Sequence, residues 1–164
     1  MIKKIVLFFL FINITFSCTK DDICSGETPT TPKLIIVFKS NLNNNFYKEV
    51  QNLTVSTIVG IDTINIYKSF TTDSIAIPLN TGTDFTDFQF IKNNTNDNPG
   101  NRDNITYSYQ RDFIYINRAC AYKTTFNDLL SQLEIVENEN WIGEITVNET
   151  TVEDENITHV TIYH

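Results

Sequence analysis

Apolar and polar residues alternate along most of the chain after residue 33. Two clear stripes are Ile75, Ile77 and Leu79, and Ile105, Tyr107 and Tyr109. A period of two is typical of strands with one buried face. Similar short segments occur at 34–38, 53–58, 64–67, 88–90, 113–116, 141–147 and 159–164. Turn residues separate them, so the pattern predicts an all-β, antiparallel β-sandwich, immunoglobulin-like or similar, over residues 33–164.

Two segments depart from simple alternation. Residues 113–116, with the sequence FIYI, are all aliphatic or aromatic and predict a strand covered on both faces. Residues 126–133 instead have helical spacing, because Phe126, Leu129, Leu130 and Leu133 stand at i, i+3, i+4 and i+7. This spacing predicts one short helix that packs against one end of the sandwich.

The N-terminal segment has the parts of a secretory signal peptide. Lys3 and Lys4 precede an unbroken apolar run at 5–12. A helix that spans a bilayer needs about 20 apolar residues, so this run is too short to remain as an anchor. A charged start, a short apolar core and a small residue before a cleavage site predict a signal peptide over residues 1–17.

The sequence around Cys18 resembles the lipobox of bacterial lipoproteins. Ser17 is the small residue before the cysteine, although Thr15 and Phe16 replace the usual Leu and small residue. The resemblance implies that Cys18 becomes the lipidated first residue of the mature protein. An ordinary signal peptide with a free Cys18 is the alternative. Residues 18–32 are polar and contain two prolines, which predicts a tether.

Lys20, Asp21 and Asp22 directly follow this cysteine. A lysine and two acids at this place resemble the surface-export signal of Bacteroidota lipoproteins, which implies the outer face of the outer membrane. The periplasmic face is the alternative location. Several acyl chains on Cys18 would hold the protein on the membrane without a transmembrane helix.

The charge balance excludes one class of partner. All 20 acidic residues follow Cys18, whereas two of the 12 basic residues precede it. The mature chain therefore has 10 basic residues and a formal charge of −10. Nucleic-acid binding needs clustered Lys and Arg, so we expect no nucleic-acid partner.

Two cysteines remain once Cys18 is lipidated. An even number of cysteines in an exported chain predicts a disulfide, here between Cys24 and Cys120. Two buried free thiols are one alternative. The other is a nucleophilic Cys120, activated by Arg118 or paired with His159 as a base.

Motifs for metal, phosphate or hydrolase chemistry are missing from the sequence, so we expect no cofactor and no enzyme activity. Asp97 and Asp103, in an oxygen-rich segment at 94–104, are candidate calcium ligands. A polar hairpin loop that turns at Pro99 and Gly100 is the alternative. Thr63 and Ser74, each between Asp and Ile, resemble the O-glycosylation sequon of Bacteroidota.

Aromatic and acidic residues leave a carbohydrate function open. Aromatic residues at strand spacing are more often core than ligand contacts. They are Phe85, Phe88, Phe90, Tyr107, Tyr109, Phe113 and Tyr115. Candidate paired carboxylates are Glu134, Glu137, Glu139, Glu153, Asp154 and Glu155. An alternative function is therefore a small glycan-binding or hydrolytic surface module.

Four segments of the chain resemble a domain-of-unknown-function family of small Bacteroidota lipoproteins. They are RACAYKTTFNDLL at 118–130, the Thr-Pro run at 28–32, NWI at 140–142 and the terminal HVTIYH. In that family a glycine usually follows the second cysteine, where this chain has Ala121. The resemblance implies a non-enzymatic accessory lipoprotein that works with an outer-membrane barrel protein.

Overall fold

The computed structural model of the protein describes residues 23–26, 28, 30–43 and 46–164. Contacts divide them into two units. The smaller contains Ile114–Lys123 and the described residues up to Thr30, and the larger contains Thr31–Phe113 and Thr124–His164. No helix suited to crossing a membrane is found in these ranges.

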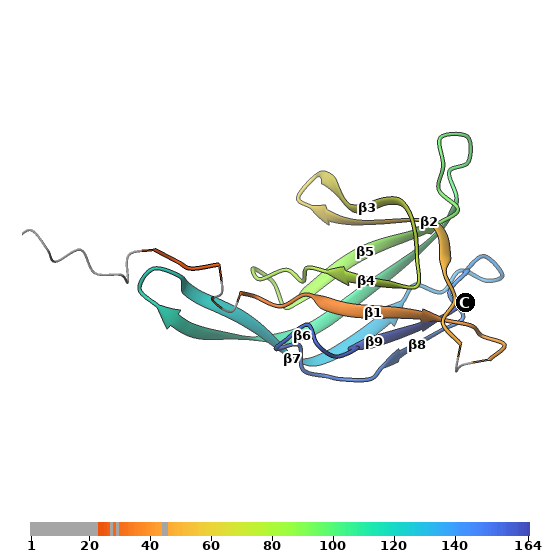
Figure 1. Ribbon diagram of the computed structural model, residues 1–164. Helices are drawn as coiled ribbons and strands as arrows, with labels where there is room; N and C mark the ends of the chain where they lie inside the picture. Colours follow the sequence, from red (N-terminus) through yellow and green to blue (C-terminus); the bar gives the residue numbers. More distant parts are fainter. Residues whose placement is uncertain (1–22, 27, 29, 44–45) are drawn as a thin grey trace, which may run out of the picture. The chain divides into compact units, whose positions relative to one another are not determined.

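The described residues form strands and connecting turns, without a helix (Figure 1). The strands are β1 (Leu34–Lys39), β2 (Val50–Val59), β3 (Asp62–Thr72), β4 (Ser74–Ile77), β5 (Phe85–Lys92), β6 (Asn101–Asn117), β7 (Ala121–Leu133), β8 (Glu144–Val147) and β9 (Val160–Tyr163). The all-β prediction is therefore confirmed.

The strands form two sheets. One has the order β4-β1-β9-β8 and the other β3-β2-β5-β6-β7. Most pairs are antiparallel, but β1 and β9 are parallel, with Ile36 opposite Val160. The prediction of an antiparallel fold is wrong for this pair. The apolar patterns of β1 and β9 indicate buried strands but carry no information on their relative direction.

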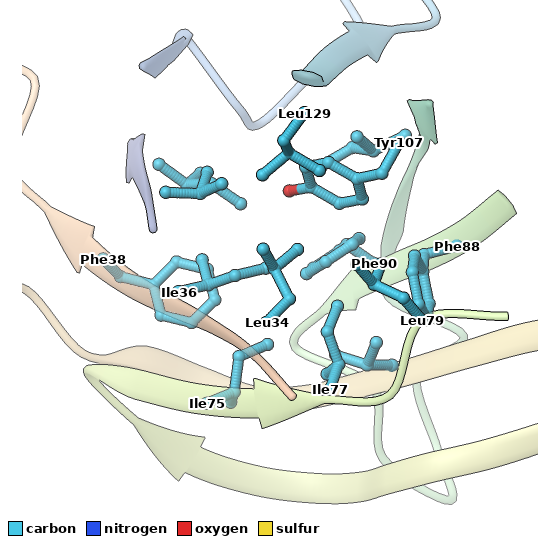
Figure 2. Close-up of a cluster of buried hydrophobic side chains, with 14 of the residues drawn as sticks. Leu34, Ile36, Phe38, Ile75, Ile77, Leu79, Phe88, Phe90, Tyr107 and Leu129 are labelled. Atoms are coloured by element: carbon cyan, nitrogen blue, oxygen red, sulfur yellow. The ribbon is translucent and has the colours of Figure 1, made fainter. Parts of the chain in front are cut away.

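Side chains from both sheets of the larger unit share one core, which makes the fold β-sandwich-like (Figure 2). Leu34, Ile36 and Phe38 of β1 are fully buried, as are Phe90 of β5 and Tyr107 of β6. The Tyr107 ring packs edge-on against Phe88, with 6.0 Å between ring centroids. The Tyr107 hydroxyl is buried and makes no hydrogen bond within the described residues. One polar group therefore lies unpaired within an apolar core.

The helix predicted at 126–133 is wrong, because these residues belong to β7. Asp128 has a φ of 53°, which interrupts the regular alternation of the strand. Phe126 and Leu129, three residues apart, are consequently both fully buried, whereas Leu130 is 64% exposed. An irregular strand thus reproduces part of the spacing of a helix.

The strand predicted at 113–116 exists, but it is not covered on both faces. Phe113, Ile114 and Tyr115 are 59%, 43% and 58% exposed. Phe85 is also exposed, while Phe88, Phe90, Tyr107 and Tyr109 are buried as expected. The core prediction is therefore right for the central residues of β5 and the first half of β6. It is wrong for Phe85, at the start of β5, and for residues 113–115, in the second half of β6.

The packed part of the chain begins slightly before the predicted boundary. Pro32 is buried, and the Thr31 hydroxyl accepts a hydrogen bond of 3.0 Å from the backbone N–H of Thr124. Residues 31 and 32 therefore belong to the larger unit, although the sequence places them in the tether.

Candidate functional site

A hollow of about 420 Å³, lined by both polar and apolar groups, lies on the outer face of the five-stranded sheet. Alternation along β5 explains which side chains reach it. Phe88 points into the core, so its neighbours Asp87 and Gln89 point to the opposite face. The lining residues are Ile58, Asp87, Phe88, Gln89, Asn104, Ile105, Thr106, Gln132 and Glu134. They come from β2, β5, β6, β7 and the residue that follows β7.

Strand register brings the polar side chains together. Asp87 lies opposite Thr106, and Gln89 lies opposite Asn104. The backbone N–H of Glu134 donates to the Asn104 carbonyl at 2.9 Å, which places Glu134 beside β6. The floor of the hollow is therefore fixed by backbone hydrogen bonds.

The two carboxylates of the hollow each accept a hydrogen bond from a neutral donor. The Thr106 hydroxyl donates to Asp87 at 2.6 Å, and the Asn104 amide nitrogen donates to Glu134 at 2.7 Å. The Asn104 side-chain oxygen is buried and has no hydrogen-bond partner within the described residues. A buried polar atom without a partner is unfavourable unless a water or ligand supplies the missing bond.

The polar groups of the lining are carboxylates, amides and a hydroxyl, with no Lys, Arg or His. Such a surface offers many acceptors and carries negative charge. It suits a neutral ligand rich in hydroxyl donors, and it disfavours an anion. Ile58, 51% exposed, adds an apolar side chain to the rim, and Phe88 and Ile105 also line the hollow.

Sequence reasoning found only Glu134 of these polar residues. The alternation of β5 and β6 marks Asp87, Gln89, Asn104 and Thr106 as outward-facing, which is the available signal. Their register across β5 and β6, and the approach of β7, depend on pairings that the sequence does not specify. The other candidate carboxylates, Glu137, Glu139, Glu153, Asp154 and Glu155, do not line the hollow.

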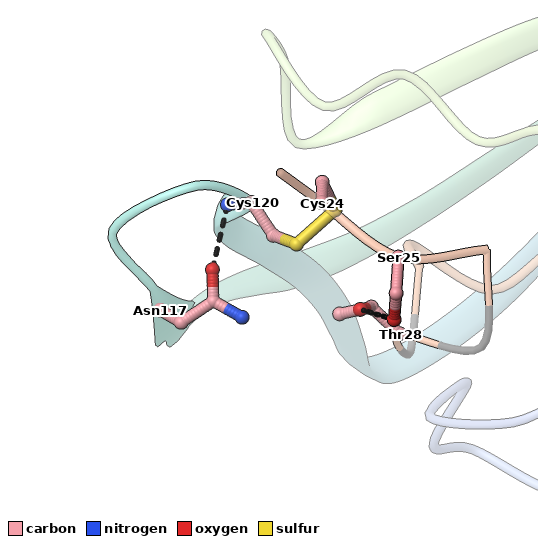
Figure 3. Close-up of a disulfide and its surroundings, with 5 residues drawn as sticks. All are labelled: Cys24, Ser25, Thr28, Asn117 and Cys120. Carbon is pink, nitrogen blue, oxygen red and sulfur yellow. Dashed lines mark hydrogen bonds between the residues drawn. A yellow bond between two sulfur atoms is a disulfide. The ribbon is translucent and has the colours of Figure 1, made fainter. Parts of the chain in front are cut away.

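The predicted disulfide between Cys24 and Cys120 is present in the smaller unit, with a Cα–Cα distance of 4.9 Å (Figure 3). The Asn117 side-chain oxygen accepts a hydrogen bond of 2.8 Å from the Cys120 N–H, and fixes the turn that carries this cysteine (Figure 3). The alternatives of free thiols and of a nucleophilic Cys120 are incompatible with this bond.

Ala121, the residue after this cysteine, has a φ of 57°. This is the left-handed region, which glycine adopts without penalty and other residues adopt at about 1–2 kcal/mol. The turn is thus formed although the chain carries alanine where the resembling family usually has glycine.

The two candidate calcium ligands lie in different environments. Asp97 is exposed in the loop between β5 and β6, whereas Asp103 is buried within β6. The Asp103 carboxylate accepts hydrogen bonds from the Ile142 N–H at 2.8 Å and from the Asn140 amide at 3.1 Å. Burial raises the pKa of Asp103, and these hydrogen bonds oppose the rise. Asp103 thus anchors residues 140–142, and no group of three metal-ligating side chains occurs among the described residues.

The two candidate glycosylation residues are both exposed, Thr63 in β3 and Ser74 in β4. The neighbour of Ser74, Ile75, is buried as expected, whereas Ile64 beside Thr63 is 49% exposed. Modification at Thr63 and Ser74 stays a prediction. Cys18, Lys20, Asp21 and Asp22 lie outside the described residues, so lipidation and surface export also stay predictions.

Both histidines are buried in the larger unit. The Nδ1 atom of His159 accepts a hydrogen bond of 3.0 Å from the Ile35 N–H, which supports the packing of β1. His164 lies between Lys92, 3.2 Å from its Nδ1, and the Lys48 carbonyl, 3.2 Å from its Nε2. These contacts fit a neutral imidazole that donates from Nε2. Burial lowers the pKa of both histidines, to about 4 for His164, where Lys92 and Lys48 contribute.

No curated protein and no solved structure matches this chain. A family model matches residues 52–164, which include eight of the nine described strands, all but β1. Strand β2 begins two residues before this range. The chain therefore belongs to the family of unknown function DUF6452.

Proposed function

We propose that this protein is a surface-exposed outer-membrane lipoprotein of the Bacteroidota type, anchored through Cys18, with a non-enzymatic β-sandwich domain that binds a neutral glycan. The observation that carries the binding function is the hollow on the outer face of the five-stranded sheet, with its two carboxylates and three side-chain amides. Its carboxylates and amides match the hydroxyl donors of a sugar, and the Asn104 side-chain oxygen lacks a partner.

Binding, and not hydrolysis, is the better use of this geometry. Asp87 and Glu134 are held by Thr106 and Asn104, respectively, through hydrogen bonds of 2.6 and 2.7 Å. Carboxylates fixed in this way act as oriented acceptors. Recognition by oriented acceptors on a rigid sheet limits the entropy lost when a ligand binds.

The test uses secreted full-length chain with Cys18→Ala, so that no acyl group is attached. Neutral oligosaccharides are titrated while amide resonances are followed by NMR. We expect shifts at residues 87–89 and 104–106. Gln132→Ala removes one polar side chain of the hollow and should weaken binding about tenfold. Gln51→Ala, an exposed glutamine of β2 outside the hollow, is the matched control and should bind normally. Binding that is equally strong in both variants, or shifts elsewhere, would contradict the proposal.

A second function is favoured by the turn that joins β2 and β3. Four aliphatic side chains there are exposed: Ile58 at 51%, Val59 at 54%, Ile61 at 99% and Ile64 at 49%. Exposed apolar clusters of this kind mark contacts with other proteins. We infer that they dock the domain onto an outer-membrane barrel protein, as an accessory subunit.

Affinity purification from gently solubilised outer membranes tests this docking. The wild-type lipoprotein should retain a stoichiometric barrel protein, and Ile61→Ser should lose it. Ile135→Ser is the matched control, because Ile135 is 84% exposed and lies outside this cluster. Recovery of the lipoprotein alone, or equal loss in both variants, would reject the docking role.

A further inference from the structure

The smaller unit exposes an apolar and aromatic surface at the turn between β6 and β7. We define the hairpin tip as Ile114–Lys123. Within it Ile114, Tyr115 and Tyr122 are 43%, 58% and 62% exposed. The two tyrosine rings pack edge to face, with 5.3 Å between their centroids. Ile23, directly before Cys24, is 82% exposed. These side chains form no part of the core of the larger unit.

The charge of the hairpin tip differs from that of the whole chain. It contains Arg118 and Lys123 and no acidic residue, in a protein whose net charge is −8. Aromatic residues are enriched where a membrane meets water, because the ring is apolar and the hydroxyl is polar. Basic residues near them are attracted to anionic headgroups. The composition of the hairpin tip therefore fits a lipid surface.

The disulfide keeps the hairpin tip close to the N-terminal segment that carries the proposed anchor. Cys120 of the hairpin tip is bonded to Cys24, with 4.9 Å between their Cα atoms. Cys24 follows Cys18 by six positions in the sequence. An extended chain advances about 3.3–3.6 Å per residue, so Cys24 lies within about 22 Å of the anchored residue. This step rests on the proposed acylation of Cys18.

We propose that the hairpin tip lies on the membrane surface. Tyr115 and Tyr122 insert at the boundary between headgroups and acyl chains, and Arg118 contacts anionic headgroups. The Cys24–Cys120 disulfide holds the hairpin tip within reach of the bilayer. The lipid anchor and the hairpin tip then form two contacts with one membrane, which restrict the rotation of the protein about its tether.

Tryptophan fluorescence tests this contact, because the chain contains a single tryptophan, Trp141. The acylated full-length protein is incorporated into vesicles of phosphatidylethanolamine and phosphatidylglycerol whose acyl chains carry bromine, a short-range quencher. Tyr122→Trp adds a reporter at the hairpin tip, and Tyr115→Trp is a second reporter in case the first variant fails to fold. Reporters at other exposed positions, Ile61→Trp, Phe85→Trp and Ile135→Trp, form the comparison set. The wild type supplies the Trp141 background.

We expect the hairpin-tip reporters to be quenched several-fold more than the comparison set. In a Cys24→Ala/Cys120→Ala background their quenching should fall toward that of the set. Equal quenching at all positions would overturn the membrane contact. Unchanged quenching without the disulfide would overturn the role of the disulfide. Mass spectrometry of Cys18 keeps these results apart from a failure of the proposed function, since an unmodified Cys18 would remove the anchor itself and with it this inference.

Discussion

Strand β6 passes through two environments. In its first half Asp103, Ile105, Tyr107 and Tyr109 are all buried, and the residues between them are less so. In its second half Phe113, Ile114 and Tyr115 are all exposed. The second half is at least as apolar as the first. The difference shows that apolar content alone does not determine burial, because a strand is buried only where another layer covers it.

The largest effect should come from breaking the disulfide of the smaller unit. Cys24→Ala/Cys120→Ala removes a link between residues 96 positions apart. On the chain-entropy model this should lower the free energy of unfolding by about 4.7 kcal/mol. Chemical denaturation measures the loss. An unchanged free energy of unfolding would contradict this stabilising role of the disulfide.

Two isoleucines of the same strand give the next largest contrast. Ile105→Ala leaves a cavity in the core and should lower the free energy of unfolding by about 3 kcal/mol. Ile114→Ala removes a partly exposed side chain and should cost about 0.5 kcal/mol. Urea denaturation of both variants measures the difference. Similar losses would mean that Ile114 is covered in solution.

Acidification should destabilise the buried region through its histidines. The pKa of His164 falls from 6.5 to about 4 on folding, and that of His159 is also lowered. Between these pH values the unfolded chain binds more protons, so stability is lost as pH falls from 6.5 to 4. His164 should contribute about 3 kcal/mol to this loss. Unfolding free energies measured across this range should decline less in His164→Gln, and an equal decline would exclude His164.

Two buried tyrosines of β6 should respond in opposite directions to loss of the hydroxyl. Tyr107→Phe removes an unpartnered hydroxyl and should stabilise the fold by about 1 kcal/mol. Tyr109→Phe removes hydrogen bonds to Thr86 at 2.6 Å and to the Asn80 carbonyl at 2.8 Å, and should destabilise it by about 1 kcal/mol. Thermal melting of the two variants is the measurement. The same sign for both would show that Tyr107 has a partner in solution.

The smallest effect is expected at the turn of the hairpin tip. Ala121→Gly relieves a left-handed backbone but adds freedom to the unfolded chain. Relief of the left-handed backbone is the larger of these two effects, so we expect the free energy of unfolding to rise by about 0.5 kcal/mol. Ala119→Gly in the same turn is the control, because Ala119 has no positive φ, and it should not stabilise. Equal stabilisation by Ala119→Gly and Ala121→Gly would show that relief of the left-handed backbone is not the cause.

Much of the fold is predictable from the sequence, because burial on one face leaves a period of two. The stripes at Ile75 and Ile77, and at Ile105 and Tyr107, identify strands that the structure contains. The end of β4 at Ile77, directly before Pro78, follows from the missing N–H of proline. The pairing of Cys24 with Cys120 follows from the number of cysteines once Cys18 is set aside as the predicted lipidation site.

Other features depend on information that local patterns lack. The spacing of Phe126 and Leu129 indicates a helix unless the positive φ of Asp128 is known. The parallel pairing of β1 with β9 is set by the route of the whole chain. The hollow depends on the register that places Asp87 opposite Thr106 and Gln89 opposite Asn104. Each of these features arises from contacts between segments distant in sequence, or from a single backbone angle.

The parallel pairing of β1 with β9 also affects when the domain can fold. Ile35 in β1 bonds to His159, which lies 124 residues later, next to β9. The sheet that contains β1 is therefore complete only when these two distant segments meet. Such long-range pairing slows folding, because the loop must close before the contacts form. Completion of this sheet should consequently be a slow step of folding, in milliseconds to seconds.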